Sequence, residues 1–257
     1  MVDPGLRARV EAYYRAFNAR DEKAYLACFH PDGAVGGTLT GVPLSGVGVQ
    51  KAILRTARGS MGDLTMTAVN LYQAQDEVAV EWAGDIRSED GARTPVVGVT
   101  LFAFDADQRI RLCQVYWNPR PPRHDGREEE NGVDPTRRTI IEAYYRGFNA
   151  RDWDGIGGLF AEEGTFGGTL SGSGLWGHKT LRSVFESVVV RFPGILMRPG
   201  RIFQAQEEVA VHWDGEAQAW DGQVKPIQGI ALFRFDALGL IARFRVYWNP
   251  RELLQQA

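Results

Sequence analysis

The sequence predicts two consecutive α+β domains that come from one duplicated unit. Three observations lead to this prediction: long strings recur at one constant spacing, each copy shows helical periodicity before strand alternation, and a charged segment with Pro and Gly separates the copies. The predicted boundaries are residues 1–121 for the first domain and 133–257 for the second. Residues 122–132, PRHDGREEENG, have the composition of an exposed linker.

The repeat is visible without any gap over nearly the whole of each copy. The string YYRAFNARD, which starts at Tyr13, returns as YYRGFNARD starting at Tyr144, 131 positions later. The same spacing relates two further pairs of strings: QAQDEVAVEW (73–82) with QAQEEVAVHW (204–213), and VYWNP (115–119) with VYWNP (246–250). A unit of this length is too long for a solenoid repeat and has the size of a small domain.

Each copy is predicted to begin with helices. Asp3-Pro4 in the first copy, like Asp134-Pro135 in the second, combines an N-cap residue with proline at the first helical position. The next apolar residues follow at helical spacing: Val10, Tyr13 and Phe17. The string NARD then ends this helix, and its Asp caps a second one. A third helix is predicted over 46–58, with its copy over 177–190.

Strands follow the helices. Apolar residues alternate with polar or small ones over 77–86, and a second strand is predicted over 97–104. After a turn at DADQ, a last strand carries Cys113, Val115 and Trp117 on one face. Helices first and an antiparallel sheet afterwards is an α+β arrangement.

Composition and short motifs exclude several classes of function. A net charge of −3 gives no electrostatic reason to expect nucleic acid or an anionic membrane as partner. No apolar run approaches the ~20 residues of a membrane span, and the N-terminus has no signal-peptide pattern. Two cysteines form no disulfide framework, and the motifs HExxH, CxxC and GxxxxGK[ST] are absent. We therefore expect a cytoplasmic protein with no metal and no cofactor.

Each copy resembles the nuclear-transport-factor-2-like (NTF2-like) superfamily. The resemblance lies in the leading helix with Y…FNARD, the second helix ending in Phe and the strands that follow. Within the superfamily, the SnoaL-like polyketide cyclases and the ketosteroid isomerases are the most similar branches. The resemblance covers nearly all of both units. It implies two tandem cones, each with three helices over a curved antiparallel sheet and a deep, mostly apolar pocket. Because relatives commonly dimerise through the outer sheet face, it also implies an intramolecular pseudo-dimer and a monomeric chain.

The resemblance to ketosteroid isomerase assigns roles position by position. That enzyme uses a tyrosine and a protonated aspartic acid as an oxyanion hole and a second aspartate as base. The oxyanion tyrosine corresponds to Tyr13 and Tyr144. The base and the protonated acid fall on residues that have no carboxyl group in either copy: Gly37, Gly168, Thr100 and Ala231. A steroid-type proton shuttle is therefore not expected.

The candidate site residues each have a structural alternative. Tyr13 and Tyr144 either donate a hydrogen bond to a substrate oxygen or pack in the core. His212 and Asp214, on one strand face, form a second candidate catalytic pair, although surface positions explain them better. The remaining candidates would bind substrate, or else fill the core and end strands: Phe17, Trp82, Trp117 and Asn118 in the first copy, and Phe148, Trp213, Trp248 and Asn249 in the second.

The function expected from this reasoning is a cofactor-independent enzyme of natural-product biosynthesis. Its pocket would fold a hydrophobic small-molecule substrate for cyclisation, isomerisation or epoxide opening, with a tyrosine polarising an oxygen. A non-catalytic binding or carrier protein for an apolar ligand is the alternative. A third possibility is a structural pseudo-dimer whose cones are filled by side chains.

Overall fold

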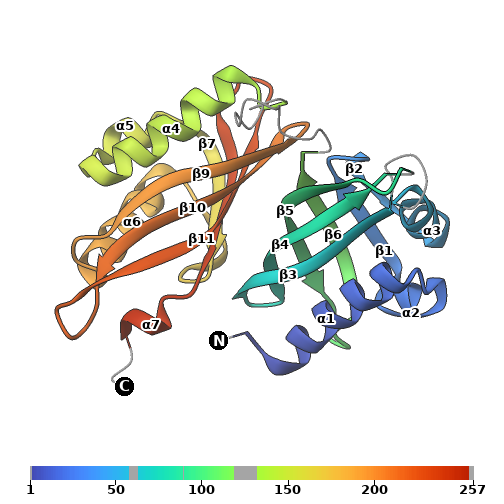
Figure 1. The fold of residues 1–257 in the computed structure, drawn as a ribbon. Coiled ribbons are helices and arrows are strands. Elements are labelled where there is room, and N and C mark those ends of the chain that lie inside the picture. The colour runs from blue at the N-terminus through green and yellow to red at the C-terminus, as the bar shows by residue number, and fades with distance from the viewer. Residues whose placement is uncertain (1, 58–62, 89, 119–131, 255–257) are drawn as a thin grey trace. The chain divides into compact units, whose positions relative to one another are not determined.

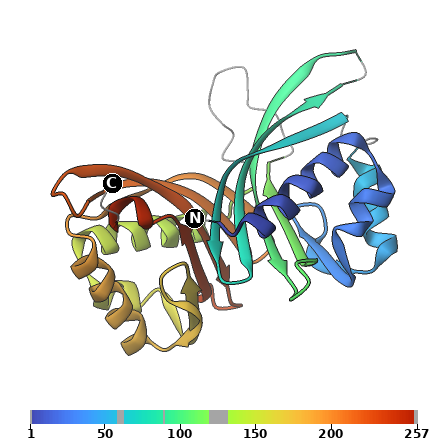
Figure 2. The same cartoon turned by 90° about the horizontal axis from the view of Figure 1, so that it is seen from below.

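The computed structural model describes residues 2–57, 63–88, 90–118 and 132–254. The chain divides into two compact units, Val2–Gly132 and Val133–Ala257, and each is described by itself (Figure 1). In each unit, helices lie against one face of a curved sheet (Figure 2). The predicted α+β class is confirmed.

The helices of the first domain are α1 (Pro4–Ala19), α2 (Glu22–Ala27) and α3 (Val47–Thr56). Two aspartates cap them as predicted. The carboxylate of Asp3 accepts a hydrogen bond from the backbone N–H of Leu6 at 3.0 Å, and that of Asp21 accepts one from the N–H of Ala24 at 3.0 Å. These caps fix where α1 and α2 begin, and hence which residues face the sheet.

The first sheet, within the described residues, has six strands in the order β2-β1-β6-β5-β4-β3. They are β1 (Phe29–Gly37), β2 (Gly41–Ser45), β3 (Asp63–Ala74), β4 (Glu77–Arg87), β5 (Arg93–Phe104) and β6 (Ile110–Trp117). The sheet differs from the prediction in one respect, because β1 and β6 run parallel and the sheet is mixed. Parallel neighbours need a long connection, and β1 and β6 are separated by all the other strands and α3.

The second domain repeats this plan. Its helices are α4 (Pro135–Ala150), α5 (Trp153–Gly157), α6 (His178–Arg191) and a short α7 (Arg251–Leu254). Its strands are β7 (Phe160–Gly168), β8 (Gly172–Trp176), β9 (Leu196–Ala205), β10 (Glu208–Gln218), β11 (Val224–Phe235) and β12 (Ile241–Trp248). They lie in the order β8-β7-β12-β11-β10-β9, with β12 and β7 parallel.

The repeated FNARD string ties the end of the first helix to the neighbouring sheet strand. The amide of Asn18 donates to the carbonyl oxygen of Met66 at 2.7 Å and accepts from its N–H at 2.9 Å. The guanidinium of Arg20 donates to the carbonyl of Leu64 and to the carboxylate of Asp63. Asn149 holds Met197 in the same way in the second domain. Most of this string therefore has a structural role.

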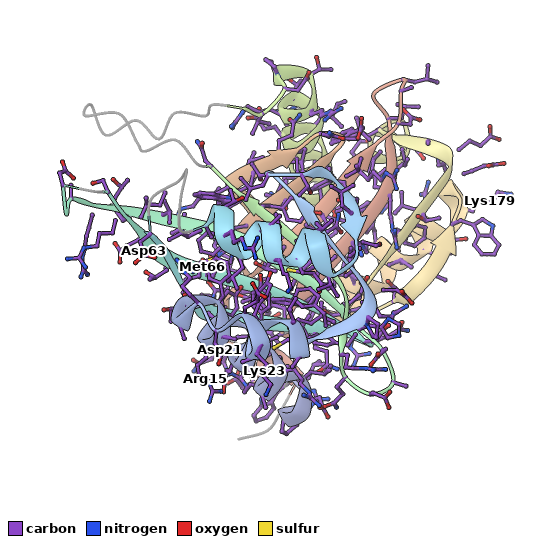
Figure 3. All side chains as sticks on the ribbon, turned by 90° about the vertical axis from the view of Figure 1, so that its right-hand side faces the viewer. Arg15, Asp21, Lys23, Asp63, Met66 and Lys179 are labelled. Atoms are coloured by element: carbon purple, nitrogen blue, oxygen red, sulfur yellow. The ribbon has the colours of Figure 1, made fainter. Side chains whose placement is uncertain are left out.

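The core of each domain lies between the helices and the covered face of the sheet. Charged side chains of α1 and α2, such as Arg15 and Lys23, lie on the outer surface of the helices (Figure 3). Aromatic residues of the same helices, including Tyr13 and Tyr25, are fully buried in this core, where Tyr13 packs against Phe102 of the sheet. This division follows the helical periodicity of the sequence.

Candidate functional site

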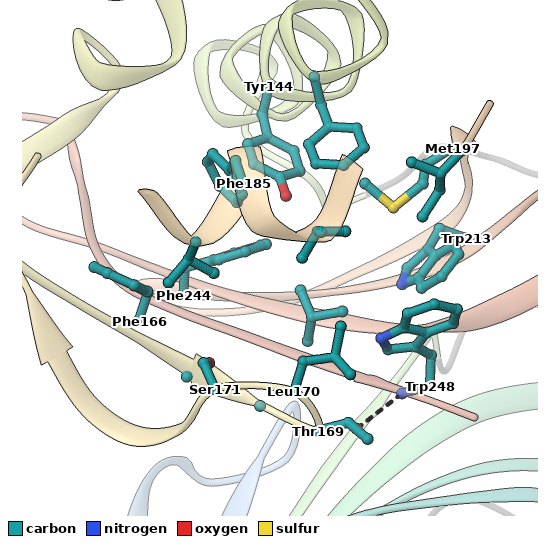
Figure 4. A pocket seen from close by; sticks show the side chains of 17 residues that line it. Tyr144, Phe166, Thr169, Leu170, Ser171, Phe185, Met197, Trp213, Phe244 and Trp248 are labelled. Carbon is teal, nitrogen blue, oxygen red and sulfur yellow. Dashed lines mark hydrogen bonds between the residues drawn. The ribbon is translucent and has the colours of Figure 1, made fainter. Parts of the chain in front are cut away.

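The second domain contains a pocket between α4, α6 and the covered face of its sheet (Figure 4). The cavity volume is about 70 Å³, well below the roughly 300–1,000 Å³ of sites for drug-sized ligands. One of its lining residues, Leu170, is 39% exposed, so this part of the wall lies at the surface. The pocket therefore has room for a small molecule or for one end of a larger one.

The pocket wall is almost entirely apolar. Its polar side chains are Tyr144, Thr169, Ser171, Trp213 and Trp248, and no carboxylate, imidazole, ammonium, guanidinium or thiol is among the lining groups described. Such a wall favours a neutral ligand, because an ion would lose its hydration without gaining a partner. The wall also offers no general base.

Tyr144 enters the pocket from α4. Its ring is buried against several others, with ring centroids 4.9 Å from Phe244 and 6.0 Å from Phe185. The hydroxyl oxygen points into the cavity (Figure 4), and it forms no hydrogen bond with the residues that the structure describes. Burial raises the pKa of this phenol above its usual value. The hydroxyl is therefore a protonated hydrogen-bond donor at neutral pH and does not serve as a base.

Two tryptophans form the sheet side of the pocket. Trp213 of β10 and Trp248 of β12 lie with ring centroids 6.2 Å apart. The nitrogen-bearing edges of both indoles face the same space as the hydroxyl of Tyr144 (Figure 4). Trp213 is 1% exposed, and its indole nitrogen has no hydrogen-bond partner in the described part of the chain.

The hairpin between β7 and β8 forms the rim. A β-bulge lies between Phe166 and Gly168, and Gly168 has φ +136°. A Cβ atom at Gly168 would lie 2.0 Å from the carbonyl oxygen of Val246, so only glycine fits here. The backbone N–H of Trp248 donates to the hydroxyl oxygen of Thr169 at 3.2 Å, which holds the rim against β12.

The equivalent tyrosine of the first domain has a different environment. Tyr13 is buried among aromatic rings, with centroids 4.9 Å from Phe102 and 5.4 Å from Tyr25. The thiol of Cys113 donates to its hydroxyl oxygen at 3.6 Å. Burial is the main reason that the pKa of Tyr13 lies well above its usual value. Its hydroxyl therefore already has a protein partner.

The structure brings together part of the predicted site. Four candidates line the pocket of the second domain: Tyr144, Phe148, Trp213 and Trp248. Four lie in the core of the first domain: Tyr13, Phe17, Trp82 and Trp117. Neither asparagine belongs to the described pocket wall. Asn118 directly follows β6, and the amide oxygen of Asn249 accepts from the N–H of Arg251 at 3.3 Å where α7 begins.

His212 and Asp214 lie outside the pocket. Both flank Trp213 on β10, and successive side chains of a strand point to opposite faces, so these two point away from the pocket. Asp214 is exposed and lies 3.8 Å from the guanidinium of Arg198. The pair that the sequence proposed for catalysis therefore does not reach this cavity.

The sequence reasoning did not single out the contribution of α6 and the hairpin. Val184, Phe185 and Val188 line the pocket from one face of α6, and Leu170 and Ser171 line it from the rim. The helical spacing of the three α6 residues is the sequence signal that could have found them.

Two classes of site have no support in the described residues. No group of three or more His, Cys, Asp or Glu side chains there is arranged to hold a metal ion. None of the helices within the described ranges has the length and apolar character needed to span a bilayer.

Comparison with known proteins identifies a family in both halves. A family model described as a SnoaL-like domain matches residues 10–112 and 141–244. A search of curated proteins finds no match.

Solved structures that resemble one half of this chain include three proteins of low sequence identity. An NTF2-like protein from Burkholderia pseudomallei is 17% identical, with 48% of this chain and 100% of that chain covered and a TM-score of 0.43. A Mycobacterium tuberculosis protein in complex with estradiol-17beta-hemisuccinate is 19% identical, with 45% and 95% covered and a TM-score of 0.40. The epoxide hydrolase/cyclase-like enzyme SalBIII, described in pyran ring formation in the polyether salinomycin, is 19% identical, with 44% and 90% covered and a TM-score of 0.40.

Proposed function

The chain belongs to the SnoaL-like domain family, and from the pocket of its second domain we propose that this domain binds a small, neutral, largely apolar molecule carrying an oxygen atom. The observation that carries the proposal is the hydroxyl of Tyr144, which points into an apolar cavity and has no hydrogen-bond partner among the described residues. A phenol in this setting donates a hydrogen bond to a ligand oxygen. The apolar wall supplies the remaining contacts.

The test compares Tyr144→Phe with Tyr13→Phe, because the two tyrosines occupy equivalent positions. The probe is cyclohexanone, a compact ketone, and binding is followed by NMR shifts of the tryptophan indole N–H groups. We expect Tyr144→Phe to weaken binding about two- to tenfold, the effect of one hydrogen bond of ~0.5–1.5 kcal/mol. Tyr13→Phe should leave the affinity unchanged. Equal affinities in all three proteins would remove the proposed role of Tyr144.

A second candidate function is ring closure or epoxide opening on the bound molecule. The same hydroxyl favours it, because a donor aimed at an epoxide oxygen stabilises the negative charge that develops there. A hydroxyl group of the substrate would attack the epoxide carbon, the carbon–oxygen bond to the epoxide oxygen would break, and the attacking group's proton would end on the new alcohol. This chemistry needs orientation and a donor, and it requires no protein base in the pocket.

Turnover of 4,5-epoxypentan-1-ol, a small hydroxy-epoxide, separates the two functions. A catalyst of this type would accelerate ring closure over the buffer rate, and Tyr144→Phe would lose most of that acceleration. If the protein binds the ketone but ring closure proceeds only at the rate in buffer, the catalytic function is excluded and binding remains as the function.

The assembly and the compartment are proposed from the family resemblance and from the cysteines. We propose a monomeric chain in which the two domains form the pseudo-dimer of the family. Light scattering should then give a single species of 28.6 kDa, and twice that mass would contradict it. Both cysteines are free and buried, which suits the reducing cytoplasm expected from the sequence.

A further inference from the structure

We propose that the indole N–H of Trp213 is a second hydrogen-bond donor of this pocket, and that the pocket therefore selects neutral carbonyl compounds such as ketones, quinones or lactones. The inference rests on the proposed function, because it concerns the same pocket. It adds a specificity-determining residue and a chemical class of ligand.

The indole N–H of Trp213 is buried and unpaired within the described part of the chain. Trp213 is 1% exposed, and its indole nitrogen has no hydrogen-bond partner among the described residues. Most buried polar groups in proteins are paired, and leaving one unpaired costs about 1–3 kcal/mol. A group that lines a cavity and lacks a protein partner can recover this free energy from a ligand. An indole N–H is a donor only, so the ligand must supply an acceptor.

The indole is held in place before any ligand arrives. Its ring lies over the backbone at Gly229 of β11, where a Cβ atom would come within 2.6 Å of a ring carbon. Trp248 packs beside it with an interplanar angle of 57°. Trp213 is also paired with Gly229 and with Pro199 on the neighbouring strands. A donor fixed in this way gives up little side-chain freedom when it binds.

The ligand class follows from the pocket's other groups. The nitrogen-bearing edge of Trp213 and the hydroxyl of Tyr144 both point toward the pocket (Figure 4). A carbonyl oxygen has two lone pairs and is an acceptor that suits donors of this kind. A carboxylate would also accept, but no cationic side chain is among the lining groups described, and its desolvation would go uncompensated. A hydrocarbon would leave both donors unpaired.

The first domain supplies a matched control. Trp82 has the same setting, with its ring over Gly98, a centroid distance of 6.3 Å to Trp117, and an indole nitrogen without a partner in the described residues. The nearby hydroxyl of Tyr13, however, already interacts with the Cys113 thiol. Trp82→Phe therefore imposes a similar structural change without touching the pocket of the second domain.

The experiment compares cyclohexanone with methylenecyclohexane, which have nearly the same shape but differ in a carbonyl oxygen. Binding is followed on the full chain by NMR of the indole N–H groups, with that of Trp213 assigned in the wild-type protein. We expect the ketone to bind about two- to tenfold more tightly. The Trp213 N–H should shift downfield with the ketone and much less with the hydrocarbon. Trp213→Phe should reduce the preference to the part that the Tyr144 hydroxyl supplies, and Trp82→Phe should keep it in full.

The outcomes separate this inference from the function on which it rests. A ketone preference that Trp213→Phe leaves unchanged overturns the role of Trp213 and leaves the proposed function intact. Equal affinity of the wild-type protein for both probes overturns the roles of both donors and leaves only an apolar site. If neither probe shifts any pocket resonance, the proposed function itself fails. The wild-type shift comparison needs no substitution, so the test stands even where Trp213→Phe does not fold.

Discussion

The sulfur of Cys113 lies 3.6 Å from the hydroxyl oxygen of Tyr13, whereas the equivalent position beside Tyr144 is occupied by Phe244, whose ring centroid lies 4.9 Å from that of Tyr144. The Cys113 thiol donates a hydrogen bond to the Tyr13 hydroxyl. The Phe244 ring beside Tyr144 has no group that could form such a bond. Two tyrosines in nearly identical strings therefore have different chemical environments.

Cys113 should be unreactive in the folded protein. It is completely buried, and burial raises the pKa of its thiol to about 12, so almost no thiolate exists at pH 8. In a Cys28→Ala background, we expect an aromatic disulfide reagent to label Cys113 only at the rate of unfolding, and immediately in urea. The release of the reagent's chromophore measures both rates. Rapid stoichiometric labelling of the native protein would contradict this.

The hydrogen bond between Tyr14 and Thr100 should stabilise the first domain. Their hydroxyl oxygens are 3.2 Å apart in the core. Thr100→Val keeps the side-chain shape but leaves the Tyr14 hydroxyl unpaired, so we expect a loss of about 1–3 kcal/mol in the free energy of unfolding, measured by urea denaturation.

The second domain offers the reverse experiment. The hydroxyl of Tyr145 has no partner among the described residues, and Ala231 takes the place of Thr100. Ala231→Thr should add the missing partner and raise stability by roughly 1 kcal/mol. A loss of stability here would show that the second core has no space for the larger side chain.

Gly229→Ala should displace the Trp213 indole. The new methyl group would lie 2.6 Å from the ring and 2.4 Å from the carbonyl oxygen of Tyr247. Overpacking of this kind costs about 1–3 kcal/mol, and the ketone should lose affinity for the pocket. Gly98→Ala imposes the same clash on Trp82 in the first domain. It should reduce stability similarly while the ketone affinity of the second domain stays unchanged.

The local features of the fold could be predicted from the sequence. Asp3-Pro4 and Asp21 start their helices as expected, because capping depends on residues only a few positions apart. The alternation of β10 puts His212 and Trp213 on opposite faces of the strand, although the sequence proposed both as site residues. The parallel pairing of β1 with β6 could not be predicted, because it joins residues about 80 positions apart in the chain.

The pocket depends on contacts that periodicity does not reveal. Tyr144 and Tyr13 are equivalent in sequence, and their surroundings differ through single substitutions such as Phe244 for Cys113 and Ile156 for Tyr25. The packing of these side chains in the folded core decides whether a tyrosine hydroxyl faces a cavity. The unpaired indole N–H of Trp213 could not be predicted from the sequence either, because the packed core decides whether a buried donor finds an acceptor.

The stability of the protein should fall steeply in alkali. Burial raises the pKa of five tyrosines above the ordinary value near 10: Tyr13, Tyr14, Tyr25, Tyr144 and Tyr145. The folded state therefore keeps these protons at a pH where the unfolded chain releases them. The resulting stabilisation is fully present below about pH 10 and is lost as pH rises above it, by about 1.4 kcal/mol per pH unit and tyrosine. The raised pKa of Cys113 acts with the same sign from about pH 9.

Urea denaturation at several pH values between 7 and 11 measures this loss, and absorbance at 295 nm reports ionisation of the phenols. We expect a nearly constant free energy of unfolding up to pH 9, and above it tyrosinate absorbance that rises together with the loss of helical circular dichroism. Tyr14→Phe should flatten the decline, because it removes one of the buried groups whose ionisation drives unfolding. The chain has eight tyrosines, so ionisation of more than three phenols near pH 10 in a protein that stays folded would contradict the burial of these five.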